Sequence, residues 1–352
     1  MPRIDEFFRD MVTQKASDLH LAVGLPVKMR IHGYLEPVSD QPLTATDATE
    51  MLQGLVSPEQ WGRFLENHDL DFAYQVPDVV RLRANFFVHH GGLGAIFRVI
   101  PTEILSCEDL NLPDVVVSLA EIRSGMVLVT GPTGSGKSTT LAAMIDHINT
   151  KLARHIITIE EPVEFVHPDK RSVIIQREVG MNSSSFAGAL RAAVREDPDV
   201  IMVGEMRDRE TVGLALRAAE MGFMILGTLH TNSAAKTLDR IIDIFPAAEQ
   251  GSARISLAAS LRGVVSQQLL RRTSGKGRIA AFEILVGSMA VSNAVREGDT
   301  AKIYSIIQSG RGLGMETMDD ALSALVKCGA VELDEARRKA HDKGKFDLPD
   351  DM

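Results

Sequence analysis

A loop with three glycines in six positions, followed by a lysine and three hydroxyl residues, is where this sequence most directly indicates a chemistry. The stretch reads VLVTGPTGSGKSTT over residues 127–140 and fits the pattern G-x-x-x-x-G-K-S. Such glycines let backbone N–H groups converge on phosphate oxygens, while the lysine reaches the β- and γ-phosphates and the next hydroxyl binds Mg²⁺. The residues predicted to contact the phosphates are Gly131, Pro132, Thr133, Gly134, Ser135, Gly136, Lys137, Ser138 and Thr139, with Ser138 as the Mg²⁺ ligand.

Two other apolar segments end in residues that suit phosphoryl transfer. The segment VIMV at 200–203 is followed by Gly204 and Glu205, and a carboxylate at this point can serve Mg²⁺ and its attacking water. The segment FMILGTLHTNSA carries His230 directly after a buried run. Polar groups at the carboxyl edge of a parallel sheet commonly contact ligands, so we predict that His230 senses the γ-phosphate.

A third strand end, IITIEEPVEF, carries three acids, Glu160, Glu161 and Glu164. Three like charges at one strand end are costly unless cations or a reacting water share the space. One of the three is a candidate for the base that orients water, and their spacing alone does not choose among them.

The elements around these residues predict an α/β domain. From Gly125 to about Ile284 short apolar runs alternate with helical segments, and the runs are MVLVTG, HIITIEEP, SVIIQREV, DVIMVGEM, FMILGTLH and IAAFEIL. Continuously apolar strands separated by helices are typical of a largely parallel sheet that is covered on both faces. The phosphate loop, Glu205 and His230 all follow strands of this predicted sheet.

The first hundred residues predict a smaller α+β domain. IDEFFRDMVTQKA has helical spacing, VKMRIHGYLEPV reads as a hairpin, and two helices follow, the second entered through Pro58. In VRLRANFF the apolar side chains alternate with Arg81 and Arg83, which therefore share one face, and Arg98 lies on the returning strand. Taken alone, these arginines indicate the solvated edge of a sheet. A proline-containing connector and a helical C-terminal region complete the expected organisation.

Composition narrows the function class. A chain of 352 residues exceeds one average core, and its 45% apolar and 24% charged residues are typical of a globular protein. The net charge of −9 argues against a generic nucleic-acid binder. Cys107 and Cys328 lie far apart without a CxxC pair, which argues against a zinc site. The acidic start MPRIDEFFRD is no signal peptide, and no apolar run reaches the roughly 18 residues of a membrane span, so we expect a cytoplasmic protein without direct membrane insertion.

With these motifs in order, the chain resembles the type IV pilus retraction ATPases, the twitching-motility motors of the secretion ATPase superfamily. GPTGSGKSTT is similar to their Walker A motif, TIEEPVEF to their Asp box, DPDVIMVGEMRD to their Walker B motif and GTLHTNSA to their His box. The early ASDLHL and PVKMRIHG are similar to their N-terminal signature. Five spaced motifs in this order are more specific than any one of them.

The resemblance implies a PAS-like N-terminal domain, a RecA-like P-loop ATPase core and a homohexameric ring that binds ATP and Mg²⁺. It makes Glu164 the general base, Glu205 the Walker B glutamate that serves the metal, and His230 the residue that responds to the γ-phosphate, beside Lys137. It also turns Arg81, Arg83 and Arg98 into candidate arginine fingers at the nucleotide. The implied boundaries are 1–100 for the PAS-like domain, 101–124 for the linker, 125–285 for the ATPase core and 286–352 for the C-terminal region.

The implied partners are an inner-membrane pilus platform protein and a paralogous retraction ATPase, which would hold this cytoplasmic protein at the membrane. Three alternatives remain at this point. A pilus assembly or type II secretion ATPase usually carries a four-cysteine zinc module, which two isolated cysteines do not supply. An accessory or non-hydrolysing subunit would not need all of Lys137, Glu164, Glu205 and His230. A nucleic-acid translocase is opposed by the acidic balance, so we expect no nucleic-acid partner.

Overall fold

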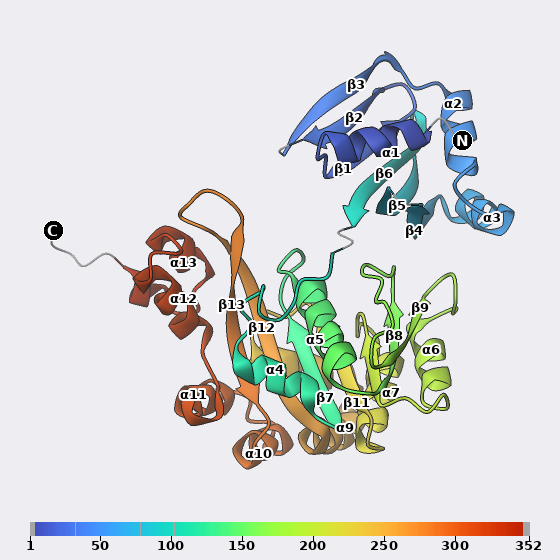
Figure 1. The fold of residues 1–352 in the computed structure, drawn as a ribbon. Coiled ribbons are helices and arrows are strands. Elements are labelled where there is room, and N and C mark those ends of the chain that lie inside the picture. Colours follow the sequence, from blue (N-terminus) through green and yellow to red (C-terminus); the bar gives the residue numbers. More distant parts are fainter. Residues whose placement is uncertain (1–3, 32, 78, 101–102, 348–352) are drawn as a thin grey trace, which may run out of the picture. The chain divides into compact units, whose positions relative to one another are not determined.

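The computed structural model describes residues 4–31, 33–77, 79–100 and 103–347. The chain forms two compact units. The first contains Met1–Glu103 and Glu161–Val166, and the second contains Ile104–Glu160 and His167–Met352. Each unit has its own sheet and its own core (Figure 1).

The first unit is a six-stranded antiparallel sheet with three helices (Figure 1). Its strand order is β3-β2-β1-β6-β5-β4. The strands are β1 (Asp18–Ala22), β2 (Pro26–Ile31), β3 (Tyr34–Pro42), β4 (Asp69–Val76), β5 (Val80–His89) and β6 (Gly92–Ile100). The helices are α1 (Ile4–Thr13), α2 (Ala45–Gln53) and α3 (Pro58–Asn67). The predicted entry through Pro58 is confirmed, because Ser57 and Gln60 form a capping box around it.

Alternation along β5 places the arginines where the sequence predicts. Leu82, Ala84 and Phe86 are fully buried, whereas Arg81 and Arg83 lie on the other face and remain half-buried. The core side is rich in aromatic rings such as the edge-to-face pair of Phe86 and Phe97. Burying each such side chain contributes about 1.5–3 kcal/mol, which fixes the register of the strand and so the face that the arginines share.

The second unit is built on a seven-stranded sheet with the order β13-β12-β7-β11-β10-β8-β9. All neighbours in it are parallel except β12 and β13, which confirms the predicted α/β class with a mainly parallel sheet. The strands are β7 (Gly125–Thr130), β8 (His155–Glu160), β9 (Val173–Glu178), β10 (Val200–Val203), β11 (Met224–Leu229), β12 (Leu261–Arg271) and β13 (Arg278–Val286). The strand β12 is missing from the sequence expectation, because its polar centre SQQ breaks the apolar run.

Helices cover both faces of this sheet. One face packs on α4 (Asp114–Glu121) and α5 (Lys137–Lys151). The other face packs on α6 (Phe186–Ala193), α7 (Arg209–Glu220), α8 (Ala234–Asp243) and α9 (Ala247–Ser260). The alternating residues of β7 divide between the two cores, with Leu128 on one side and Val127 on the other. Helix α4 lies in the expected connector, and its Val116 and Leu119 are buried in the second unit because their spacing gives the helix an apolar face.

The C-terminal region is helical, as its amphipathic pattern predicts. It contains α10 (Met289–Glu297), α11 (Lys302–Ser309), η1 (Arg311–Leu313), α12 (Met318–Lys327), α13 (Leu333–Lys339) and η2 (Lys343–Phe346). Buried Asp319 accepts hydrogen bonds from the backbone N–H groups of His341 (2.7 Å) and Asp342 (3.0 Å), which ties the last helices together. Among the described residues, no helix has the length and apolar character needed to cross a lipid bilayer.

His167, between β8 and β9, predicts a pH-dependent stability. Its side chain is 8% exposed, and burial lowers its pKa to about 4, with the charge of Asp146 opposing the shift and that of Lys170 adding to it. A histidine held neutral loses stability as pH falls from about 6.5 through about 4, and the shift corresponds to about 3 kcal/mol. We expect His167→Gln to remove about 2–3 kcal/mol of the acid dependence of the unfolding free energy.

Urea unfolding at pH 7 and pH 4.5 measures this dependence. The exposed His90 offers the matched control, because His90→Gln keeps the buried imidazole. An acid dependence equal in the His167→Gln and His90→Gln chains would contradict the assignment.

Candidate active site

The phosphate loop connects β7 to α5, and three of its glycines have positive φ angles. The values are 147° at Gly131, 77° at Gly134 and 90° at Gly136. A Cβ at Gly131 would lie 2.3 Å from the carbonyl oxygen of Gln267 and 2.5 Å from the Oγ of Ser135. Only glycine fits there, so the glycine spacing of the sequence follows from the backbone path.

The loop has groups suited to anionic oxygens. Ser135 is 3% exposed, and its Oγ has no hydrogen-bond partner among the residues that the structure describes. Helix α5 begins directly after Gly136, which supplies no side-chain cap for the first N–H groups. A 15-residue helix directs its positive N-terminus at the loop, and together these donors fit phosphate groups.

Gln267 on β12 packs against the phosphate loop. The sequence alone does not predict this residue as part of the site. Its Oε1 accepts a hydrogen bond from the Oγ1 of Thr140 (2.7 Å), and its side chain is 4% exposed. Its Nε2 lies 2.8 Å from the position of a Cβ on Gly136. The available signal was the polar SQQ inside an otherwise apolar run, since a buried amide requires a polar partner.

The side chain of Lys137, the first residue of α5, reaches back to the start of the phosphate loop. Its Nζ donates to the carbonyl oxygens of Gly131 (2.9 Å) and Pro132 (3.2 Å) and lies 3.4 Å from the Nδ1 of His230. An ammonium group only donates, so the Nδ1 of His230 is the acceptor in this contact. The first residue of α5 is therefore linked directly to the loop that follows β11.

His230 also contacts Glu205, at the end of the neighbouring strand. The Nε2 of His230 lies 2.9 Å from the Oε1 of Glu205. Because a carboxylate accepts and Lys137 donates, a neutral imidazole with its proton on Nε2 satisfies both contacts. Three residues predicted from separate motifs thus form one chain, Lys137–His230–Glu205, at the carboxyl edge of the parallel sheet.

Arg207 contacts the same oxygen of Glu205, with its Nε 2.5 Å from Oε1. Burial alone raises the pKa of Glu205, whose side chain is 18% exposed, but the hydrogen bonds from Arg207 and His230, the charge of Arg207 and, when its ring is protonated, the charge of His230 lower it. The net pKa lies below the ordinary glutamate value. The carboxylate is therefore ionised at neutral pH.

The first of the three acids, Glu160, is the last residue of β8, and the other two follow it. The Oε1 of Glu160 accepts hydrogen bonds from the Oγ1 of Thr158 (2.6 Å) and the Nε2 of Gln176 (3.2 Å). Glu161 and Glu164 belong instead to residues 161–166, which are part of the first compact unit. The role of Glu164 as general base stays a prediction.

The three candidate arginines share one face of the first unit's sheet, and Arg83 lies directly opposite Arg98 in the register of β5 and β6. Arg81 donates to the carbonyl oxygen of Val163 (3.1 and 3.2 Å), Arg83 pairs with Asp71, and Arg98 pairs with Asp18 (2.8 Å). The hydrogen bond from Arg83 to Asp71 raises the pKa of Arg83, burial opposes this, and the charges of nearby acids reinforce it. These partners orient the guanidinium groups, and their function as fingers stays a prediction.

Ser138 is exposed in the first turn of α5, and Glu205 lies beyond the end of β10. Within the described ranges, no group of three or more His, Cys, Asp or Glu side chains is arranged to hold a metal ion. Mg²⁺ bound with nucleotide phosphates requires only one or two protein oxygens, because phosphates and waters fill the other positions. The donor set is therefore compatible with a phosphate-bound Mg²⁺.

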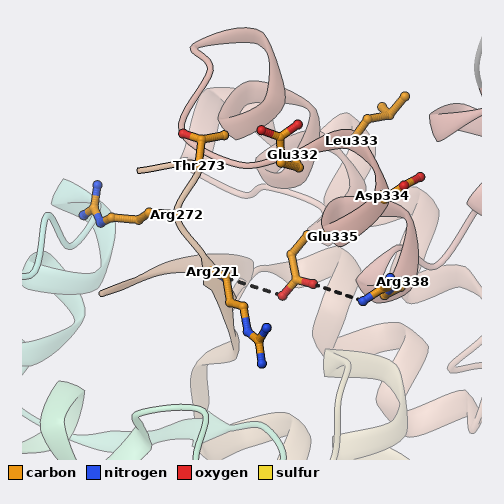
Figure 2. Close-up of a pocket in the computed structure, with 8 residues that line it drawn as sticks. All are labelled: Arg271, Arg272, Thr273, Glu332, Leu333, Asp334, Glu335 and Arg338. Atoms are coloured by element: carbon orange, nitrogen blue, oxygen red, sulfur yellow. Dashed lines mark hydrogen bonds and ion pairs between the residues drawn. The ribbon is translucent and has the colours of Figure 1, made fainter. Parts of the chain in front are cut away.

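A separate hollow of about 440 Å³ lies at the far end of β12, beside α13 (Figure 2). Its lining carries charged side chains of both signs. Glu335 accepts from the backbone N–H of Arg271 (3.4 Å) and lies 3.9 Å from Arg338. The hollow is lined by Arg271, Arg272, Thr273, Glu332, Leu333, Asp334, Glu335 and Arg338, none of which was predicted as a site residue.

The chain is similar over most of its length to known proteins. The family model described as Type II/IV secretion system protein matches residues 1–343. The chain is 47% identical over 337 residues to the type IV pilus retractation ATPase PilT of Pseudomonas aeruginosa, covering 96% of this chain and 98% of that protein. It is 48% identical over 325 residues to a twitching motility protein of Neisseria gonorrhoeae, covering 92% and 87%. A crystal structure of the pilus retraction motor PilT with bound ADP has a TM-score of 0.89 and 45% identity, covering 97% of each chain.

Proposed function

We propose the function of this chain from one premise: it belongs to the type II/IV secretion system protein family. Within that family it is a retraction ATPase, which binds and hydrolyses ATP to drive type IV pilus retraction and so twitching motility. The observation that carries this conclusion is the Lys137–His230–Glu205 chain beside the phosphate loop. Such an arrangement supports phosphoryl transfer, because that reaction uses a cation, a hydrogen-bonding group and a carboxylate around the γ-phosphate of ATP.

Each residue of the proposed active site then has a separate role. The loop N–H groups and Lys137 hold the β- and γ-phosphates, and His230 reports on the γ-phosphate to Glu205. Glu164 orients the attacking water. Ser138 and Glu205 serve Mg²⁺, which when bound neutralises charge on the phosphate oxygens. The low pKa of Glu205 supports this assignment, because an ionised carboxylate is the form that attracts a cation.

We further propose that the protein works as a homohexamer in which Arg81, Arg83 and Arg98 complete a nucleotide site. A guanidinium against the γ-phosphate stabilises the transition state and contributes about 10³–10⁵-fold to kcat. The three arginines lie on one face of the sheet. This supports the role, because one nucleotide lying against that face can contact all three. Hydrolysis is then possible only when the ring closes on the nucleotide, which couples chemistry to movement.

We propose a cytoplasmic location at the inner membrane, through the pilus platform protein and with a paralogous retraction ATPase as a further partner. The whole-chain likeness to a retraction ATPase supports retraction over pilus assembly. Two measurements test the function. Purified protein should hydrolyse ATP. A deletion strain should carry excess surface pili and should not twitch. The wild-type gene should restore twitching in that strain, and the Glu205→Ala variant should not. Loss of pili in the deletion strain would contradict retraction and indicate assembly.

A further inference from the structure

The loop that carries His230 is anchored on its N-terminal side to the turn that carries Glu205. The Oγ1 of Thr228 donates to the carbonyl oxygen of Gly204 (2.5 Å), and the N–H of Met206 donates to the carbonyl oxygen of Thr228 (3.1 Å). Thr228 is 5% exposed, so water does not compete for these bonds. The loop has a fixed starting point beside Glu205.

On its C-terminal side the loop is anchored to α8 by two threonines. The Oγ1 atoms of Thr231 and Thr237 lie 2.6 Å apart, and the hydroxyl of Thr237 donates to the carbonyl oxygen of Ser233 (2.7 Å). A hydroxyl has one proton, so Thr237 is the acceptor and Thr231 the donor in the contact between them. Thr237 is fully buried, whereas Thr231 is half-buried and directly follows His230.

Helix α8 is itself a rigid support. The N–H of its first residue, Ala234, donates to the Oε1 of Glu283 (2.7 Å), a carboxylate that is 4% exposed on β13. The Oγ1 of Thr237 also lies 3.5 Å from that of Thr130, which bonds the Oγ of Ser266 at 2.9 Å. Thr130 is the last residue of β7 before the phosphate loop, so α8 is positioned by the same strands that position the loop.

We infer that Thr237 is a positioning residue for ATP hydrolysis, which acts through Thr231 to hold His230 between Lys137 and Glu205. This rests on the proposed function of His230. Without the acceptor at position 237, the hydroxyl of Thr231 turns to water, and Thr231 and its exposed neighbours His230 and Asn232 gain freedom. His230 then spends less time in contact with both partners, and turnover falls while the phosphate loop still binds nucleotide.

The competing interpretation is that Thr237 only bonds within its own helix, as buried threonines often do. Ser260 provides the matched control, because its buried hydroxyl makes the same bond four residues back, to the carbonyl oxygen of Ser256 (2.7 Å). It lies at the end of α9, before the start of β12. Ser260→Ala therefore removes an equivalent hydrogen bond without touching the His230 loop.

The test compares Thr237→Val, Thr237→Ser and Ser260→Ala as purified full-length proteins. We expect Thr237→Val to lower kcat about tenfold with the Kd for ADP within about twofold of wild type. Thr237→Ser should restore kcat, and Ser260→Ala should leave it unchanged. Equal kcat in Thr237→Val and wild type, or an equal loss in Ser260→Ala, would overturn the inference. If Thr237→Val does not fold, Thr231→Val removes the same bond from its donor side and is read in the same way.

A double-mutant cycle with His230→Ala separates this inference from the proposed function. If Thr237 acts through His230, the effect of Thr237→Val disappears in the His230→Ala background. A full tenfold loss in both backgrounds would overturn the inference and leave the role of His230 intact. An unchanged kcat in His230→Ala alone would overturn the proposed role of His230 and the inference with it.

Discussion

A Lys137→Ala chain is expected to lose ATP hydrolysis by at least about 10²–10³-fold, the cost of removing one preorganised charge from a site of this kind. The Nζ of Lys137 lies within hydrogen-bond distance of Gly131 and Pro132 and contacts His230. Alanine removes the ammonium that we propose binds the β- and γ-phosphates, and it also removes the partner of the His230 ring. Both losses act on the transition state, in which negative charge on the phosphate oxygens is largest.

Phosphate release by the purified protein measures this loss, and nucleotide titration shows how much binding remains. Lys151 provides a matched control, since it is an exposed lysine at the other end of the same helix. Lys151→Ala should keep turnover within about twofold, as expected for a surface charge at a helix end. Turnover of Lys137→Ala within threefold of wild type would contradict the assignment of the phosphate loop.

The parts of the site that the sequence predicted are those whose chemistry is local. The positive φ angles of Gly131, Gly134 and Gly136 favour glycine, so the spacing of glycines in the sequence predicts the backbone conformation of the loop. Glu205 and His230 follow apolar runs, and parallel strands bring such ends to one edge. Convergence of Lys137, His230 and Glu205 follows from these two rules without knowledge of any side-chain contact.

What the sequence did not predict depends on contacts between distant segments. Strand β12 was missed because buried Gln267 reads as polar, and only its partner Thr140, 127 positions earlier, explains its place inside the sheet. The acids that orient the arginines were also missed. Asp18 lies 80 positions from Arg98, and no periodicity in either strand indicates that β1 and β6 are neighbours.

The second large effect is expected at Glu205. Glu205→Gln keeps the size and one acceptor oxygen of the side chain but removes its charge. Because the pKa of Glu205 is held below the ordinary value, the neutral form is scarcely populated in the wild-type protein near pH 7. Glutamine therefore imposes a state that the native site avoids, and it leaves Arg207 and His230 without the carboxylate that pairs them. We expect turnover to fall by about 10²–10⁴-fold, the range found when a charged catalytic group is lost.

Nucleotide binding should respond in the opposite direction. With Glu205 beside the phosphates as we propose, removal of its negative charge lowers the repulsion that ATP meets, so we expect the affinity of Glu205→Gln for ATP to equal or exceed that of wild type. Single-turnover hydrolysis together with ATP titration measures both quantities on one preparation. Glu210 is the control, because it is an exposed acid in the first turn of α7 that pairs with Arg191. Glu210→Gln should keep wild-type turnover, and an equal loss in the two variants would show that charge near α7, rather than the contact with His230, determines hydrolysis.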